Sequence, residues 1–190
     1  MSSAFEALFA TEEPPDLGPA PRAGVLSEAA VDAALDEVFR KCPVRNRQPF
    51  LKALVLLWHD HLEAAHTLAQ EMDTADGAFL HGIMHRREPD YSNAAYWFRR
   101  VGRHTAFPEL GRRAAGRLVG PEAQSLRREL LPRGEWDPFA FIGACERVIS
   151  LAPSDNQRRL VRDLQSMELQ TLLDYFLDEN SAGIDRTSRL

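Results

Sequence analysis

The sequence predicts an all-α protein, a single-domain bundle of about eight helices. Apolar residues recur every three or four positions along most of the chain, which is the spacing that one buried face of an α-helix requires. The sequence shows no sustained alternation of apolar and polar residues, the pattern that would predict β-strands. Prolines and capping residues divide the helical stretches into short segments, and short helices joined in pairs are typical of helical-repeat proteins.

The length and composition indicate one folded domain between two less regular ends. The chain has 190 residues, of which 44% are hydrophobic, and this is enough for a sizeable core. We expect residues 26–180 to form the helical domain and residues 181–190 to form a frayed tail. Residues 1–25 are rich in proline, so we expect an extended arm over the surface, from which the Phe5–Phe9 segment can dock onto the core.

Two helices are expected before residue 72. Ser27 is a suitable N-cap for the first helix, and the segment 42–48 ends it. The second helix begins at Pro49, because a first turn leaves its N–H groups unpaired and proline has none. It is expected to continue without a break to about Glu71, along the apolar stripe Leu51, Leu54, Val55, Trp58, Leu62, Ala65 and Ala69.

The third and fourth expected helices flank a proline turn. The third stops before Pro89, since the residue that precedes a proline disfavours helical geometry. The fourth spans Asn93–Val101 and is closed by Gly102. Their expected N-caps are Asp73 or Thr74 for the third and Asp90 or Ser92 for the fourth.

The second half of the chain predicts four further helices. The first three are expected near Pro108–Val119, from Pro121, and from Pro138 after a capping Asp137. Ser154 or Asp155 opens a long last helix, whose apolar residues continue to Phe176.

The charge balance argues against a general nucleic-acid-binding protein. The formal net charge is −5 and the pI is about 5.7. The arginines are unevenly distributed, because the segment Arg86–Arg133 holds eleven of them against five acids. Five of these offer a basic face, which is interpreted either as a weak nucleic-acid surface or as a solvated helix face: Arg112, Arg113, Arg117, Arg127 and Arg128.

The sequence predicts a cytoplasmic protein without a membrane segment. No apolar run approaches the roughly 20 residues that span a bilayer, and the longest is Ala53–Trp58. The first residues lack the basic start and apolar stretch of a signal peptide. Cys42 and Cys145 are far apart in sequence, so we expect free thiols in a reducing compartment.

The six histidines all lie between positions 59 and 104, and this clustering is the main functional indication in the sequence. Within the second expected helix, His59, Glu63 and His66 are spaced to lie on one face. Within the third, His81, His85 and Glu88 are spaced in the same way. Because a short loop joins these two helices, they should pack antiparallel with the two polar stripes facing each other.

Two interpretations of these stripes remain open. Imidazole and carboxylate groups at helical spacing are the ligands that a divalent cation requires, with Glu63, His66, His81 and His85 as the candidates. The spacing Glu63-x-x-His66 is also found in carboxylate-bridged helical bundles, although those need two such pairs and the sequence has one. Alternatively, these side chains are hydrogen-bonded groups at a helix edge.

The segment from His81 to His104 combines aromatic, basic and acidic residues around Pro89. One interpretation is a pocket in which arginines bind an anionic ligand between aromatic walls. The candidate donors are Arg86, Arg87, Arg99 and Arg100, and the candidate walls are Tyr91, Tyr96 and Trp97. The other interpretation is structural, with arginine–acid pairs bracing the turn and aromatic residues filling the core.

The same region resembles a family of uncharacterised helical proteins from bacteria and fungi. The resemblance is carried by His66-Thr-Leu-Ala-Gln70 and by the block from Leu80 to Gly102, which contains His-Gly-Ile-Met-His-Arg-Arg-Glu, Asp-Tyr, Asn-Ala and Tyr-Trp. It covers about a quarter of the chain and implies no reaction. Family members often have proline where this chain has Thr105. The segment Asn93–Arg100 also looks like one helix of a Sel1-type repeat, a protein-interaction module.

The sequence therefore predicts a small-ligand-binding protein, with an anionic ligand and with or without a divalent metal. In an enzyme, a histidine would be the general base and Glu63 or Glu88 would orient it. The alternative is a non-enzymatic interaction module of the helical-repeat (Sel1/TPR-like) type. The expected pocket residues are His59, Glu63, His66, His81, His85, Arg86, Arg87, Glu88, Tyr96, Trp97, Arg99 and Arg100.

Overall fold

The computed structural model describes residues 2–42, 44 and 46–178, and all regular structure within them is helical. This confirms the all-α fold, with ten α-helices in the described chain where about eight are expected from the spacing of apolar residues. The α-helices are α1 (Ser2–Leu8), α2 (Glu28–Lys41), α3 (Gln48–Trp58), α4 (Leu62–Ala69), α5 (Ala75–Arg87), α6 (Tyr91–Val101), α7 (Phe107–Arg117), α8 (Gln124–Leu130), α9 (Pro138–Val148) and α10 (Asn156–Leu177). Short 3-10 turns precede α8 and α9, at Pro121–Ala123 and Pro132–Gly134.

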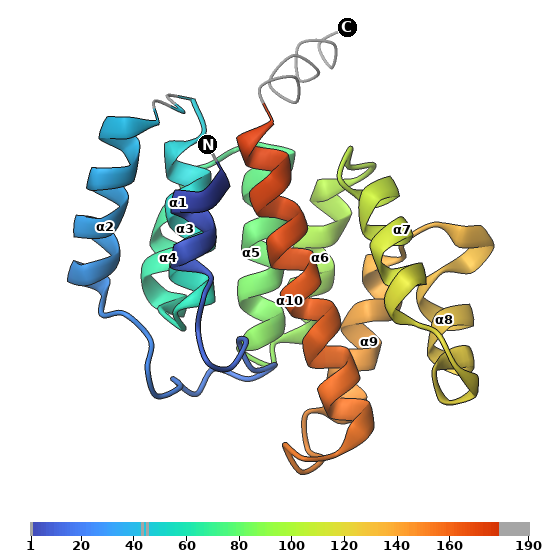
Figure 1. Cartoon of the computed structure of the whole chain (residues 1–190). Helices are drawn as coiled ribbons and strands as arrows, with labels where there is room; N and C mark the ends of the chain where they lie inside the picture. The colour runs from blue at the N-terminus through green and yellow to red at the C-terminus, as the bar shows by residue number, and fades with distance from the viewer. Residues whose placement is uncertain (1, 43, 45, 179–190) are drawn as a thin grey trace, which may run out of the picture.

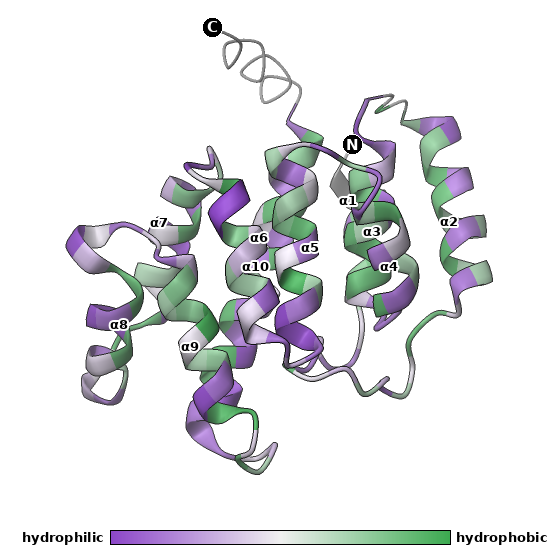
Figure 2. Ribbon diagram, turned by 180° about the vertical axis from the view of Figure 1, so that it is seen from behind, coloured by the Kyte–Doolittle hydropathy of each residue, from purple (hydrophilic) through white to green (hydrophobic). Residues whose placement is uncertain are grey.

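The long helix α10 runs through the middle of the bundle (Figure 1). It packs against α3 from the first half of the chain and against α7 and α9 from the second half, so α10 connects the two halves of the bundle. Helix α5 packs mainly on α6 and also contacts α3 and α4. Figure 2 shows that α3 is largely hydrophobic, whereas the outer helix α2 carries both hydrophilic and hydrophobic residues, as expected for a helix with one buried face. Among the described residues, no helix combines the length and apolar character needed to cross a membrane.

The helix starts follow the capping residues of the sequence. A side-chain oxygen of each cap accepts a backbone N–H from the first turn, which satisfies a donor that the helix itself leaves unpaired. Where two caps were expected as alternatives, the hydrogen bonds select one of them. The caps observed are Ser27 for α2, Thr74 for α5, Asp90 for α6, Asp137 for α9 and Asp155 for α10.

The expected unbroken helix from Pro49 to Glu71 is wrong, because the chain forms α3 and α4 with a sharp turn between them. Asp60 lies in this turn with φ of 66°, a left-handed conformation that interrupts helical hydrogen bonding. Its buried carboxylate accepts hydrogen bonds from Arg22, at 2.8 Å, and from Arg87, at 2.7 Å. Partners distant in sequence therefore stabilise this turn against the local helical pattern.

The N-terminal arm is a structural part of the core rather than a surface strap. Helix α1 forms where an extended segment is expected, and it brings the fully buried Phe5 and the nearly buried Phe9 onto the bundle. Leu17 is also buried, although the segment around it has no helix. The neighbouring Asp16 carboxylate accepts a hydrogen bond from Arg158 of α10 at 2.6 Å, and its backbone oxygen accepts one from Gln165 at 2.9 Å. The tail expected at residues 181–190 lies outside the described residues.

Candidate metal centre

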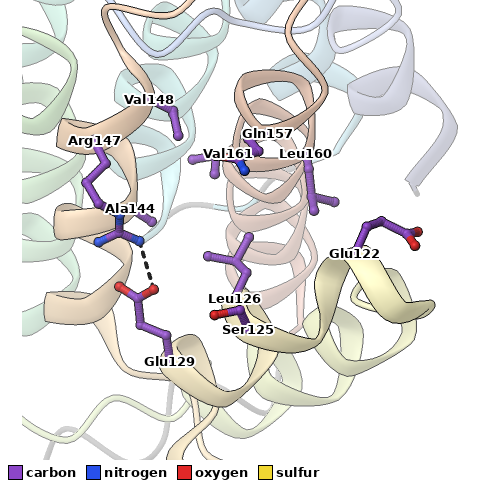
Figure 3. A pocket seen from close by; sticks show the side chains of 10 residues that line it. All are labelled: Glu122, Ser125, Leu126, Glu129, Ala144, Arg147, Val148, Gln157, Leu160 and Val161. Carbon is purple, nitrogen blue, oxygen red and sulfur yellow. Dashed lines mark hydrogen bonds and ion pairs between the residues drawn. The ribbon is translucent and has the colours of Figure 1, made fainter.

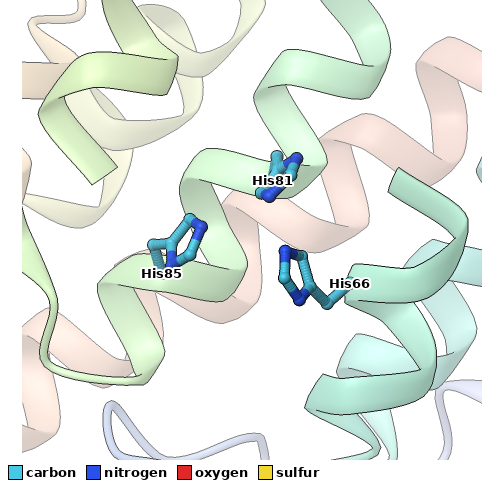
Figure 4. Close-up of side chains that lie close together, drawn as sticks. All are labelled: His66, His81 and His85. Atoms are coloured by element: carbon cyan, nitrogen blue, oxygen red, sulfur yellow. The ribbon is translucent and has the colours of Figure 1, made fainter. Parts of the chain in front are cut away.

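Three histidines from α4 and α5 lie together. One ring nitrogen of each of His66, His81 and His85 can be chosen so that all three atoms lie within 4.8 Å of one another. Figure 4 shows His66 reaching from α4 toward the two rings that α5 carries one turn apart. These are three of the four residues that the sequence offers as metal ligands.

The arrangement follows from the helical geometry. His81 and His85 are four residues apart on α5, so their rings lie on one face and stack with centroids 4.9 Å apart. The short connection at residues 70–74 returns the chain, and α4 packs on α5. His66 then meets both rings edge-on, with centroids at 4.7 Å from His81 and 5.4 Å from His85.

The His81 imidazole is deeply buried and electrically neutral near pH 7. Trp97 of α6 stacks on it, with ring centroids 3.8 Å apart and planes inclined by 13°. Burial, and then the neighbouring His66 and His85, lower the pKa of His81 to about 4. Its Nδ1 atom has no hydrogen-bond partner among the described residues. Buried polar atoms are rarely left without a partner, so this unpaired nitrogen is an unusual feature of the buried ring.

His85 is oriented by two further side chains. Its Nδ1 atom lies 3.3 Å from the Glu88 carboxylate, and its Nε2 atom lies 3.1 Å from the amide nitrogen of Asn93. When Nδ1 carries the proton, it donates a hydrogen bond to the Glu88 carboxylate. The Nε2 lone pair then accepts a hydrogen bond from the Asn93 amide. Burial lowers the pKa of His85, although Glu88 opposes this effect. Asn93 is absent from the residues predicted to form the site; its signals in the sequence are its place in the first turn after Pro89 and the Asn-Ala pair of the block from Leu80 to Gly102.

Two predicted members of the His/Glu stripes lie elsewhere: the turn at Asp60 separates His59 from α4, and Glu63 faces another hollow although it shares α4 with His66. His59 caps the end of α3, and its ring nitrogens contact the backbone at Leu26 N and Leu8 O. Glu63 is exposed and lines a hollow of about 420 Å³ beside α2 and α3. The expectation that these two side chains face His81 and His85 is therefore wrong.

Arg86 and Arg87 are not available to a ligand, contrary to the sequence-based expectation. Both side chains are fully buried. Arg86 pairs with Glu168 of α10 and lies over the Phe141 ring, and Arg87 pairs with Asp60. A buried guanidinium requires such a partner, because an unpaired charge in the core is strongly unfavourable.

The remaining predicted residues lie on the outer side of α6. Tyr96 is 48% exposed and contacts Trp97 edge-on, at 5.4 Å between centroids. The guanidinium carbon of Arg100 lies over the Trp97 ring, 5.3 Å from the ring centroid, and the same side chain pairs with Asp73 at 2.9 Å. Arg99 is exposed. Of this group, only Trp97 touches the histidine cluster directly.

A separate hollow of about 230 Å³ lies between α8, α9 and α10 (Figure 3). Polar and apolar side chains line it in equal measure, and the Arg147–Glu129 ion pair at 2.8 Å crosses one side. None of the predicted site residues lines it. Its lining residues are Glu122, Ser125, Leu126, Glu129, Ala144, Arg147, Val148, Gln157, Leu160 and Val161.

Comparison of the chain with protein-family models, with curated proteins and with solved structures finds no match. The resemblance to a helical family of bacteria and fungi therefore stays a prediction, and the chemistry of the site has to be argued from its own residues.

Proposed function

We propose that the protein binds one divalent transition-metal ion through His66, His81 and His85. The observation that carries this proposal is the convergence of three ring nitrogens within 4.8 Å, on three rings of which the buried His81 also keeps an unpaired Nδ1. Imidazole suits zinc, copper, nickel and iron, whereas magnesium and calcium prefer oxygen ligands. We therefore expect selectivity for the first group.

The spacing of the nitrogens is close to what a bound ion needs. Two imidazole nitrogens on one tetrahedral zinc lie about 3.4 Å apart, given Zn–N distances of about 2.0–2.1 Å. In the structure the three nitrogens lie within 4.8 Å of one another, so small rotations of the rings are needed to bring them to the spacing of a bound ion. His66 is only partly buried and has the most freedom to rotate. Three histidines leave a fourth position open for water or a ligand, the arrangement typical of catalytic rather than structural zinc.

The protonation state of the cluster favours metal binding at neutral pH. A metal ligand must be the neutral imidazole, and the lowered pKa values of His81 and His85 keep both rings neutral there. When Nδ1 of His85 carries the ring proton, it donates a hydrogen bond to Glu88 and leaves Nε2 free for an ion, as is common where carboxylates orient metal-bound histidines. The Asn93 amide would give up its contact with Nε2 when the ion binds.

The test is a titration of the untagged, chelator-treated protein with Zn²⁺ by calorimetry, and with Co²⁺ by visible absorption. We expect one equivalent to bind and tetrahedral cobalt bands to appear. His66→Ala and His85→Ala should each weaken binding by about 100-fold or more, since even residues that only orient ligands contribute about 10–100-fold.

The matched control is Glu63→Gln, which changes a residue of the predicted metal set that lies outside the cluster. It should bind Zn²⁺ as tightly as the unmodified protein. If the unmodified protein binds neither ion at one equivalent, or if His66→Ala binds as well as Glu63→Gln, the proposal is wrong.

A further inference from the structure

We infer a second ligand site, which takes a small organic anion with a planar aromatic body. The site is a cavity of about 700 Å³ between the turn at residues 102–108 and the segment at residues 132–139. Cavities of about 300–1,000 Å³ are typical of small-molecule sites. His104 is the only histidine that lines it, and the residues of the metal cluster do not.

The walls of the cavity are aromatic rings and prolines. Phe107 comes from the first of these two segments and Trp136 and Phe139 from the second, and Pro108, Pro132 and Pro138 lie beside them. Phe139 is 45% exposed, although large aromatic side chains are mostly buried in this protein. Rigid, flat walls of this kind bind planar rings by stacking and by burial of apolar surface.

Trp136 adds a nearly buried indole ring to the wall. The side chain is 4% exposed, and its Nε1 atom has no hydrogen-bond partner among the described residues. Buried indole N–H groups nearly always find an acceptor. The Trp136 N–H is itself shielded from solvent, so it lies behind the wall of the cavity, and recognition of a charged ligand falls to the groups at the rim.

The charges around the cavity favour an anion. Arg103 and Arg133 are exposed, and within the described part of the chain neither forms an ion pair or a side-chain hydrogen bond. Of the two acids in the lining, Asp137 is engaged as the N-cap of α9, which leaves Glu135 as the opposing charge. Two guanidinium groups against one free carboxylate leave a net positive rim.

The backbone around the cavity also favours a negatively charged ligand. Helices α7 and α9 both begin at the cavity, and the N-terminus of α7 has Ala106 as its cap, with no side-chain hydrogen bond. Helix N-termini carry partial positive charge and unpaired N–H groups. Arg133 also has φ of 58°, a conformation that costs energy for a residue with a side chain, and such residues cluster at functional sites.

The experiment compares two fluorescent probes of similar shape. 8-Anilinonaphthalene-1-sulfonate is an aromatic anion, and N-phenyl-1-naphthylamine is its uncharged counterpart. We expect the sulfonate to bind saturably at one site. The double variant R103Q/R133Q should weaken it by about tenfold or more, the effect of losing one charge-assisted hydrogen bond, and should leave the uncharged probe within about twofold.

The matched control is R117Q/R128Q, which removes two exposed arginines that do not line the cavity. It should bind both probes normally, and Phe139→Ala should weaken both because it removes a wall. Since Arg103, Arg133 and Phe139 are exposed, these variants should fold, which circular dichroism verifies. Equal sulfonate affinity in R103Q/R133Q and R117Q/R128Q, or binding that does not saturate, would overturn the inference. Binding that persists in His66→Ala with chelator separates this site from the metal centre.

Discussion

Trp97 lies flat against His81, with the two ring centroids 3.8 Å apart and the planes 13° from parallel. The indole thus covers one face of an imidazole whose other face stacks toward His85. Helix α6 thereby holds a ring of α5 in place, although no residue of α6 belongs to the three-histidine cluster. The precision of the metal site is expected to depend on this contact, because ligands that can rotate bind less tightly.

Removing the indole should therefore weaken metal binding without removing a ligand. We expect Trp97→Ala to lower the affinity for Zn²⁺ by about tenfold, within the range for residues that orient metal ligands. Trp97→Phe retains a flat ring and should lose less. Competition with a chromophoric chelator measures both, and Tyr96→Ala, which removes the exposed neighbour, is the control. Identical affinities for Trp97→Ala and Tyr96→Ala would show that the stacking does not matter.

The metal-free protein should lose stability as the pH falls from about 6.5 to about 4. The pKa of His81 is lowered in the folded state, so the unfolded chain binds the proton more readily in this window. The stabilisation is complete above the unfolded pKa of about 6.5 and is lost toward the folded value. At about 1.4 kcal/mol for each pKa unit, the loss from His81 reaches at most about 3 kcal/mol.

Urea unfolding at a series of pH values checks this prediction. A His81→Leu variant lacks the titrating group, so its stability should fall less steeply between pH 6.5 and 4. His59 and His85 also have lowered pKa values, and they should retain part of the slope. An unchanged slope in His81→Leu would contradict the assignment of the effect to His81.

Asp60→Asn should destabilise the fold severely. The carboxylate is fully buried and pairs with Arg87, which is fully buried too, so the substitution leaves an uncompensated guanidinium in the core. Breaking a buried pair from one side costs about 3–5 kcal/mol. The control is Asp73→Asn, whose exposed partner is Arg100; exposed pairs contribute about 0–1 kcal/mol. Chemical denaturation compares the two variants, and similar free energies of unfolding would refute the prediction.

Gly82→Ala should destabilise the protein even though alanine favours helices. A Cβ atom at this position of α5 would lie 2.8 Å from two carbons of the Phe98 ring, which is buried and cannot move aside freely. Overpacking of this kind costs about 1–3 kcal/mol. In α7, a Cβ atom on Gly116 would meet nothing within 4 Å, so Gly116→Ala should stabilise by about 0.5–1 kcal/mol. Thermal unfolding of the pair gives the two opposite signs, and a shift in the same direction would contradict the close approach of α5 and α6.

The sequence predicts the start of many helices well, because capping is local. Thr74 and Asp90 accept hydrogen bonds from residues three positions ahead, so the information lies within one turn. The pairing of His81 with His85 is predictable for the same reason, since it depends only on the helical repeat.

The parts that could not be predicted depend on contacts between distant residues. Nothing near Asp60 in the sequence breaks the apolar stripe, and its partners are Arg22 and Arg87. The resulting turn separates His59 from the α4 residues with which it is predicted to share a face, and the His59 ring contacts the backbone at Leu26 and Leu8 instead. In the same way, an arginine is normally exposed, and only the contact with Glu168, 82 residues away, accounts for the buried Arg86.

The contacts of Asp16 with Arg158 and Gln165 join residues that are 142 and 149 positions apart. During synthesis, the segment around Asp16 cannot make these contacts until α10 has been made. At about 5–20 residues per second, that interval is on the order of 10 s. For this time Leu17 and its neighbours lack their final packing partners, so the nascent chain is expected to expose this segment to chaperones and proteases.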